Sequence, residues 1–341
     1  MAVFSKVTQE TLQNLLSNFN IGELLYFEGI QAGIENTNYF IYTSEDTYVL
    51  TIFEKLTFDQ APFYLSLMRH LAKRRTPCPL PILSKKGELL QLCDGKPTTI
   101  VSRLNGRAVD QPNIYHCYEI GKALAISHQD AKDFPEIQNN TRSLLWWKKT
   151  TPEIIKFLPR QKQEIILDEL KEQELFLNSS NYKALPKAVV HADLFRDNAL
   201  FLEQEEGKNN KAIKSLKKPN LLKEKLGGII DFYFAGYDSL IYDLAVVAND
   251  WAIHHNSREI GSFKTNELNY LLKGYQSIRA LTASEMEAWP MTLRSAAFRF
   301  WISRLYDWFV PREATLLTPK DPTQFEIILL KRKSEMRKKS C

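Results

Sequence analysis

The stretch His191-Ala192-Asp193-Leu194-Phe195-Arg196-Asp197-Asn198 decides the fold of this chain. Apolar residues flank it on both sides, Val189-Val190 before it and Ala199-Leu200-Phe201-Leu202 after it, so the sequence predicts a strand, a loop and a second strand. Within the loop, a histidine stands two residues before Asp193, and Asn198 stands five residues after it. One short loop thereby presents a carboxylate and a side-chain amide.

The spacing H-x-D-x-x-x-x-N is typical of the catalytic loop of kinases. Transfer of a phosphoryl group to a hydroxyl requires an acceptor for the departing proton, and the carboxylate of Asp193 can serve as that base. The reaction also requires an oxygen ligand for Mg²⁺ beside the phosphates, and the side-chain carbonyl of Asn198 offers one without adding negative charge. We therefore predict that Asp193 is the catalytic residue and that Asn198 is a metal ligand.

A second acidic residue, Asp231, follows the apolar stretch Gly228-Ile229-Ile230 in a strand predicted over residues 226–234. A hard cation that bridges the β- and γ-phosphates of a nucleotide is commonly held by a carboxylate. One aspartate after an apolar run is most often structural, but the two motifs in this order favour an ATP- and Mg²⁺-dependent kinase. We therefore predict ATP and Mg²⁺ as cofactors and Asp231 as the second metal ligand.

Strand-forming residues dominate the first part of the chain. Aromatic and β-branched side chains fill residues 38–42 and 48–53, a helical pattern follows over 58–74, and two further strands are predicted within 88–104. These elements indicate a small N-terminal lobe, residues 1–104, made of a β-sheet and one helix on the phosphate side of the nucleotide.

Long helices dominate the second part, residues 105–341, and are predicted at 115–129, 151–179 and 291–310. This larger, mainly helical C-terminal lobe would contain the catalytic loop, the metal site and the acceptor pocket. Residues 203–225 are polar and lysine-rich between two apolar strands, which indicates a mobile hairpin insertion. The sequence therefore predicts an α+β, bilobal, protein-kinase-like fold.

The segments HADLFRDNALF and GGIIDFYFAG resemble the catalytic and metal motifs of the aminoglycoside phosphotransferase/choline kinase superfamily. Within it, the chain is similar to bacterial homoserine kinases of that fold from about residue 20 to residue 310, and the segments that carry this similarity include 33–40, 48–54, 242–245 and 299–305. The resemblance implies ATP-dependent phosphorylation of L-homoserine to O-phospho-L-homoserine, a step toward threonine. Composition and spacing do not indicate that substrate.

The resemblance also implies a role for each matching residue of the larger lobe. It places the base at Asp193 and the metal ligands at Asn198 and Asp231. His191 and Asp243 fall on positions that brace the catalytic loop in this superfamily, and we interpret both as structural support.

The nucleotide side of the smaller lobe departs from the protein-kinase pattern. Gly33, Asn36 and Asn38 are candidates for a turn over the phosphates, and we assign Arg103 to the same group of cofactor contacts. The turn lacks the full G-x-G-x-x-G spacing, so a plain hairpin is an alternative. Thr51 stands where protein kinases place a phosphate-binding lysine, which leaves open the residue that replaces it.

Homoserine has a carboxylate and an ammonium group, so its site requires an arginine for the first and a carboxylate or carbonyl for the second. The candidates for the carboxylate are Arg196, Arg294 and Arg299, and those for the ammonium are Glu35 and Asp238. We favour Glu35, Arg196 and Arg299 as substrate residues. Aromatic neighbours indicate a semi-buried guanidinium at Arg299, which a structural ion pair explains equally well.

Charge and composition restrict the partners. The formal net charge of +5 is small and partly confined to a basic C-terminal run that we interpret as a solvated end, so we expect neither nucleic acid nor a membrane as partner. The four cysteines form no C-x-x-C pair, which indicates a reducing compartment. We expect a cytoplasmic protein whose partners are a small-molecule amino acid and ATP, and the oligomeric state stays open.

Two other functions are compatible with the sequence. The first is a kinase for choline, ethanolamine or an aminoglycoside. Such cationic acceptors require a site rich in acidic residues, but the stretch after Asp231 contains only Asp238 and Asp243 nearby. The second is a catalytically inactive nucleotide-binding scaffold, against which the intact Asp193 and Asn198 argue.

Overall fold

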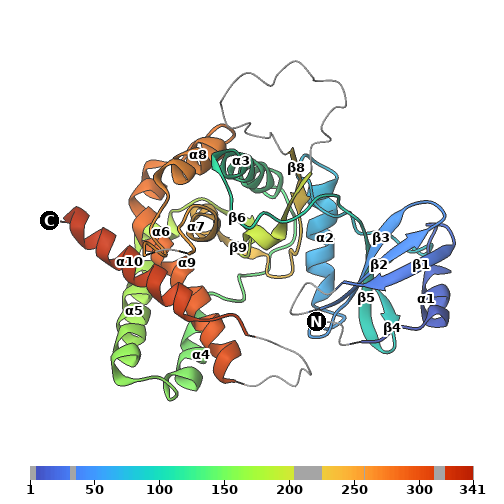
Figure 1. Ribbon diagram of the computed structural model, residues 1–341, viewed down its shortest axis with the longest axis horizontal. Coiled ribbons are helices and arrows are strands. Elements are labelled where there is room, and N and C mark those ends of the chain that lie inside the picture. The colour runs from blue at the N-terminus through green and yellow to red at the C-terminus, as the bar shows by residue number, and fades with distance from the viewer. Residues whose placement is uncertain (1–4, 31–35, 203–224, 257, 311–318, 341) are drawn as a thin grey trace.

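A computed structural model describes residues 5–30, 36–202, 225–256, 258–310 and 319–340. It places a small strand-rich lobe beside a larger helical lobe (Figure 1). The small lobe contains a five-stranded antiparallel sheet in the order β1-β2-β3-β5-β4. Its elements are α1 (Gln9–Leu16), β1 (Leu24–Gly29), β2 (Thr37–Thr43), β3 (Thr47–Ile52), α2 (Ala61–Ala72), β4 (Gln91–Cys93) and β5 (Lys96–Ser102).

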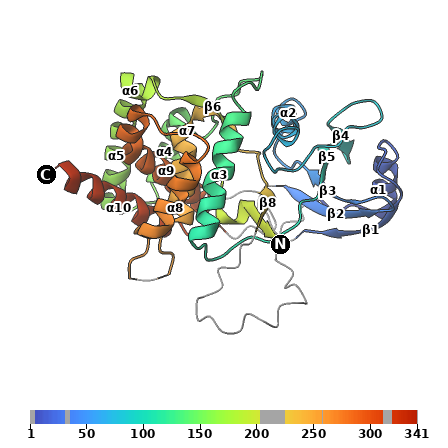
Figure 2. The ribbon, with the colours of Figure 1, turned by 90° about the horizontal axis from the view of Figure 1, so that it is seen from above.

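The sheet has two chemically different faces because side chains alternate along each strand. Every second residue of β2 is buried, and Tyr39 and Ile41 pack with Leu12 and Leu16 of α1 in a separate small core. Figures 1 and 2 both show α1 on the side of the sheet away from the helical lobe. The opposite face of β2, which carries Asn38, Phe40 and Tyr42, is therefore turned toward the helical lobe.

Helix α2 joins the two lobes. Its buried residues belong to the same hydrophobic core as the helical lobe. The Phe63 ring packs edge-on against Phe134 with 5.8 Å between centroids, and Tyr64 packs against Tyr233 at 6.2 Å. The burial of several apolar side chains contributes several kcal/mol, so the packing of α2 fixes the sheet relative to the helical lobe.

The larger lobe surrounds a buried central helix. All twelve residues of α7 (Leu240–Trp251) are buried, and Figure 1 shows this helix end-on among its neighbours. Two short antiparallel pairs, β6 (Lys187–Val190) with β9 (Gly236–Ser239) and β7 (Ala199–Leu202) with β8 (Lys225–Ile229), flank a short 3-10 turn at Arg196–Asn198. The other helices are α3 (Ile114–Asp130), α4 (Leu144–Ile155), α5 (Arg160–Asn178), α6 (Ser180–Lys183), α8 (Thr265–Gln276), α9 (Ala283–Phe309) and α10 (Thr323–Ser340).

The structure corrects one predicted helix. The segment 151–179 is not one helix but the end of α4 and the whole of α5, separated after Ile155. Pro159 caps α5 with extended backbone angles, and a proline disfavours helical geometry in the residue before it. Pro152 lies inside α4.

The predicted α+β class is otherwise confirmed by the sheet and the helical lobe. The predicted boundary after residue 104 falls in the connection between β5 and α3. Of the predicted insertion 203–225, residues 203–224 lie outside the described part of the chain. Among the described residues, no helix is both long and apolar enough to cross a bilayer.

Candidate active site

The catalytic loop follows β6 and is held by one buried carboxylate. The two oxygens of Asp243, on α7, accept the backbone N–H groups of His191 and Ala192, each at 2.8 Å. Ala192 has a φ of +62°, which costs a non-glycine residue about 1–3 kcal/mol unless its surroundings enforce it. The two hydrogen bonds to Asp243 enforce this conformation directly before Asp193.

Asp243 remains ionised although it is fully buried. Burial alone would raise its pKa, but hydrogen bonding to His128 and to the backbone of His191 keeps the pKa below its ordinary value. The Nε2 atom of His128 lies 3.1 Å from Asp243 Oδ2, and its Nδ1 atom lies 2.8 Å from the Tyr275 hydroxyl. A charged acceptor strengthens each bond that shapes the loop.

His191 connects the catalytic loop with the segment that carries Asp231. Its Nδ1 atom accepts the backbone N–H of Asp193 at 3.2 Å, which assigns the ring proton to Nε2, 2.9 Å from the carbonyl oxygen of Ile230. The ring packs against Phe232 with 4.6 Å between centroids. Burial lowers the pKa of His191, which fits a neutral, bracing imidazole.

Hydrogen bonds also link Asn198 to Asp193 and to the segment just before Asp231. The Asn198 side-chain Nδ2 donates to the carbonyl oxygen of Asp193 at 2.9 Å, and the Ile230 N–H donates to the carbonyl oxygen of Asn198, also at 2.9 Å. With Nδ2 so engaged, Oδ1 is the atom of Asn198 that can bind a cation. Asp231 follows Ile230 directly, with an exposed side chain and a φ of +65°.

These donors fit a magnesium ion that arrives with nucleotide phosphates. A carboxylate and an amide oxygen are hard ligands, and Mg²⁺ in phosphotransfer sites is held by one or two carboxylates together with phosphates and waters. The described residues contain no cluster of three or more His, Cys, Asp or Glu suited to a metal. Asn198 and Asp231 therefore suit a site in which the protein and the nucleotide phosphates together coordinate the ion, rather than one in which all ligands come from the protein.

Two glycines allow this segment to approach the lobe connection. A Cβ atom on Gly227 would lie 2.3 Å from the carbonyl oxygen of Asn105, and one on Gly228 would lie 2.7 Å from that of Pro77. The Ile229 N–H donates to Pro77 O at 2.7 Å. Because real Cβ atoms do not tolerate such contacts, the glycines before Asp231 are needed for close backbone packing.

The environment of Asp193 suits a general base. Its side chain is only 15% exposed, and burial raises the pKa of its carboxyl to about 7, with Asp231 and Asp197 adding to the shift. The Arg299 guanidinium opposes the shift through its Nη1 atom, 3.2 Å from Asp193 Oδ1. A carboxyl with a pKa near neutrality binds a substrate proton more strongly than an ordinary aspartate.

Arg299 itself is buried in α9 and packed between aromatic rings. Its guanidinium carbon lies 3.7 Å from the centroid of Phe300 and 5.3 Å from that of Phe234. Its Nε atom is buried without a hydrogen-bond partner among the described residues. The predicted semi-buried guanidinium is therefore present, and its ion-pair partner is the predicted catalytic residue.

Other predicted substrate residues have structural partners. Arg196 donates from its backbone N and its Nε to Asp250 at 2.8 and 3.1 Å. Arg294 pairs with the fully buried Glu169 at 2.5 Å. Asp238 accepts from Asn140 and from the Tyr182 hydroxyl at 2.8 and 2.6 Å. These contacts favour support roles for the three residues over acceptor binding.

The structure describes some of the predicted nucleotide and substrate residues of the small lobe, but not all of them. Gly33 and Glu35 lie outside the described residues, whereas Asn36 is buried just before β2. Asn38 Oδ1 accepts from the hydroxyl of Thr51 at 2.8 Å, so Thr51, at the position of the expected lysine, orients Asn38. Arg103 lies over the ring of Phe40, 4.3 Å from its centroid, on the sheet face opposite α1.

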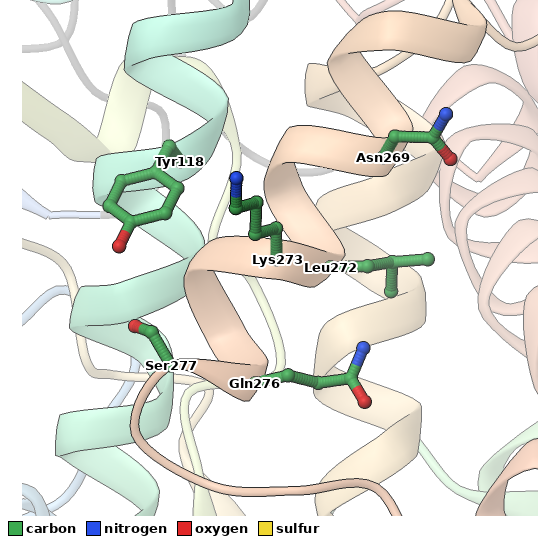
Figure 3. Close-up of a pocket in the computed structure, with 6 residues that line it drawn as sticks. All are labelled: Tyr118, Asn269, Leu272, Lys273, Gln276 and Ser277. Atoms are coloured by element: carbon green, nitrogen blue, oxygen red, sulfur yellow. The ribbon is translucent and has the colours of Figure 1, made fainter.

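A cavity of about 200 Å³ lies between α2 and the segment after Asp231. The residues that line it come from both lobes and include Asn36, Lys55, Gln138, Arg142, Tyr233 and Phe234. Gln138 and Arg142 lie in the connection between α3 and α4, which contains no recognisable sequence motif, so the sequence pattern does not predict them. A larger hollow of about 600 Å³ lies between α3 and α8, and Figure 3 shows Tyr118 and Lys273 among its walls. No predicted site residue lines that hollow.

The chain is similar over most of its length to a protein family and to two homoserine kinases. The model of the "Phosphotransferase enzyme family" matches residues 27–209 and 216–281. A homoserine kinase of Paraburkholderia xenovorans is 45% identical over 334 residues, 98% of this chain and 96% of that protein. A homoserine kinase of Cupriavidus necator is 45% identical over 336 residues, with 97% and 96% covered.

Two solved structures share the fold at low identity. An amicoumacin kinase in complex with AMP-PNP, Ca²⁺ and Ami has a TM-score of 0.66 at 16% identity, covering 98% of this chain and 94% of that one. A choline kinase of Cryptosporidium parvum has a TM-score of 0.64 at 14% identity, covering 98% and 97%. These two structures confirm the kinase-like fold, and the family match together with the two homoserine kinases confirms the predicted resemblance.

Proposed function

This chain belongs to the phosphotransferase enzyme family, and from that premise we propose that it is a homoserine kinase. It would transfer the γ-phosphoryl group of ATP to the side-chain hydroxyl of L-homoserine and release ADP and O-phospho-L-homoserine. The observation that carries the proposal is the 43–45% identity to homoserine kinases over nearly the whole chain. We place the reaction in the cytoplasm, where ATP and free amino acids meet.

In the proposed mechanism Asp193 accepts the proton of the acceptor hydroxyl as its oxygen attacks the γ-phosphorus. The bond from that phosphorus to the β,γ-bridging oxygen breaks, and ADP leaves with the electron pair. The raised pKa of the Asp193 carboxyl supports this role, since a base with a pKa near 7 accepts a proton with little penalty. Arg299 would hold the carboxylate in position through the 3.2 Å contact.

Asn198 Oδ1 and the carboxylate of Asp231 would hold Mg²⁺. A bound Mg²⁺ supplies positive charge that neutralises the β- and γ-phosphates. The hydrogen bonds that link Asn198, Ile230 and His191 support this assignment, because they hold the backbone before Asp231 against the loop that contains Asn198.

The nucleotide would bind under the sheet. Gly33, Asn36 and Asn38 are proposed contacts to its phosphates, and Arg103 is a further one. The orientation of Asn38 by Thr51 and the contact of Arg103 with Phe40, on the sheet face opposite α1, support the proposal. Glu35 stays a predicted ligand of the substrate ammonium.

An ADP-release assay with a panel of alcohols tests the proposed function. We expect kcat/KM for L-homoserine to exceed those for L-serine, choline, ethanolamine and kanamycin by about 100-fold or more, because each missing or mismatched charged contact costs about 2–3 kcal/mol. A higher kcat/KM for choline or kanamycin would be consistent with the family but would refute L-homoserine as the acceptor. Binding of ATP without turnover on any alcohol would indicate an inactive scaffold.

Replacing Asp231 by alanine tests the metal site. We expect kcat to fall by about 10²–10³-fold and the Mg²⁺ concentration for half-maximal rate to rise by about tenfold, because one of two protein ligands is lost. The measurement is a titration of Mg²⁺ at saturating ATP and acceptor. Asp94→Ala, in the turn between β4 and β5, is the matched control, since that aspartate also has a positive φ but lies in the small lobe. An unchanged Mg²⁺ dependence would contradict the role of Asp231.

A further inference from the structure

We propose that Phe325, on helix α10, is a positioning residue for the reaction, because it holds the loop of Asp193 and the side chain of Arg299 in the geometry in which Arg299 contacts Asp193. The inference rests on the proposed function, since it requires Asp193 to be the base. It gives a role in the reaction to a helix that lies beyond the residues matched by the phosphotransferase family model, which end at residue 281.

Three phenylalanine rings from separate parts of the chain meet beside this loop. Phe195 follows Asp193 by two residues, Phe300 lies on α9 and Phe325 lies on α10. The ring centroids of Phe195 and Phe300 are 4.4 Å apart, those of Phe300 and Phe325 are 5.1 Å apart, and those of Phe195 and Phe325 are 5.9 Å apart. Tilted rings at such distances attract one another beyond the burial of their area. The position of each ring therefore depends on the other two.

The aromatic cluster supports the proposed base in two ways. The guanidinium carbon of Arg299 lies 3.7 Å from the centroid of Phe300, and its Nη1 atom lies 3.2 Å from Asp193 Oδ1. The backbone N–H of Phe195 donates to the carbonyl oxygen of Asp193 at 2.8 Å. A shift of the cluster would therefore move both the cation that contacts the carboxylate and the backbone that carries it.

Phe325 is held in place by its own surroundings. Helix α10 packs against α9 (Figures 1 and 2), and Phe325 is only 1% exposed. The guanidinium carbon of Arg304 lies 4.5 Å from the centroid of its ring. Arg304 also donates to the carbonyl oxygen of Asp321 at 3.0 Å and to Gln324 Oε1 at 2.9 Å. Because a close-packed interior transmits displacement, a ring fixed in this way can fix its neighbours.

The charged contact between the same segment and the loop is a weaker candidate for this role. Lys320 Nζ lies 2.9 Å from Asp197 Oδ2, but the two side chains are 49% and 58% exposed. An ion pair that is so accessible to water contributes little to holding a backbone in place. The buried ring of Phe325 is therefore the residue of this segment that we assign.

Replacing Phe325 by leucine tests the role. Leucine stays apolar but is smaller and offers no ring to Phe195 and Phe300. We expect kcat for L-homoserine to fall about tenfold, because a small misplacement of a catalytic group slows the chemical step. We expect KM for ATP to change by less than about twofold, since the proposed nucleotide contacts lie in the small lobe.

The titration of Asp193 gives a readout that a merely structural role would not move. Among the groups whose charges act on this carboxyl, Arg299 and Lys320 lower its pKa, whereas Asp231 and Asp197 raise it. A looser contact with Arg299 raises the pKa, so the unprotonated base is lost at a higher pH. We expect the acidic limb of kcat/KM to move up by about half a pH unit. Carbon-13 NMR of the carboxyl, assigned with Asp193→Asn, measures the same shift without turnover.

Ile328→Ala is the matched control on the same helix. Ile328 is fully buried, and it lies beside Gly261, where an added Cβ atom would be 3.2 Å from Ile328 Cγ1. We expect this change to lower the denaturation midpoint at least as much as Phe325→Leu does, because it leaves a larger void. We expect kcat to stay within about twofold of wild type and the Asp193 titration to stay in place.

Three results would each overturn the inference: an unchanged kcat in Phe325→Leu, an unchanged titration of Asp193 in that variant, or an equal loss of kcat in Ile328→Ala. Phe325→Met, which keeps most of the buried volume, takes the place of the leucine variant if that protein does not fold. A wild-type enzyme that does not phosphorylate homoserine would refute the proposed function, and the NMR titration would then decide the positioning role by itself.

Discussion

Replacing Asp193 by alanine is expected to lower kcat by about 10³–10⁴-fold and to leave the affinity for ATP within a few-fold. The carboxylate acts on the acceptor proton, and the loss of a general base typically removes a factor of 10²–10⁴. Its burial, its pKa of about 7 and its contact with Arg299 place this variant at the upper end of that range. Single-turnover kinetics and nucleotide titration measure the two quantities separately.

The matched control for this variant is Asp197→Asn. Asp197 lies on the same loop, but its side chain is 58% exposed and pairs with Lys320 at 2.9 Å. We expect this change to alter kcat by no more than a few-fold, since exposed ion pairs contribute little. An Asp193→Ala enzyme that retained most of its activity would show that another group takes the proton.

The pH profile gives a second readout of the same carboxylate. A base must be unprotonated to accept a proton, so its active fraction is complete above its pKa and falls below it. With the pKa of Asp193 at about 7 in the free enzyme, kcat/KM is expected to decline about tenfold per pH unit below pH 7 and to level off above it. A profile that is flat from pH 5 to pH 8 would argue against Asp193 as the titrating base.

Replacing Asp243 by asparagine is expected to lower the free energy of unfolding by about 3–5 kcal/mol, because an ionised and fully buried hydrogen-bond acceptor is lost. Asp243 accepts from the backbone of His191, the backbone of Ala192 and the ring of His128. Asparagine has one oxygen for these three donors and turns an amide N–H₂ toward the rest, so at least one buried donor is unpaired. Chemical denaturation followed by tryptophan fluorescence measures the change.

Asp133→Asn is the control for stability. Its side chain is 68% exposed and pairs with Arg74 at 2.7 Å on the surface, so the denaturation midpoint should not move detectably. A midpoint for Asp243→Asn equal to wild type would contradict the view that this carboxylate enforces the positive φ of Ala192. Loss of activity with unchanged stability would instead indicate a direct catalytic role.

The chemistry of the site was predictable because its parts are close in sequence. His191, Asp193 and Asn198 belong to one loop between two apolar strands, and hydrogen bonds within that loop or to the segment before Asp231 fix their geometry. Short-range spacing therefore brought together the residues that we propose as the base and the metal ligands. The lobes were predictable for a related reason, since strand and helix patterns repeat over a few residues. The helix predicted over 151–179 was wrong because the break before Pro159 was not recognised.

The sequence by itself determined the fold class and the family of this protein, and it placed the proposed base and metal ligand on one loop, because these features depend on local order along the chain. Only the tertiary structure decided which distant charges meet. It paired Arg299 with Asp193 across 106 residues, gave Arg196 to Asp250, and brought Arg142 to the wall that also contains Lys55. A pattern of apolar residues determines which face of an element is buried, but the partner of a charged side chain depends on how whole helices pack, and packing is not encoded at any fixed spacing.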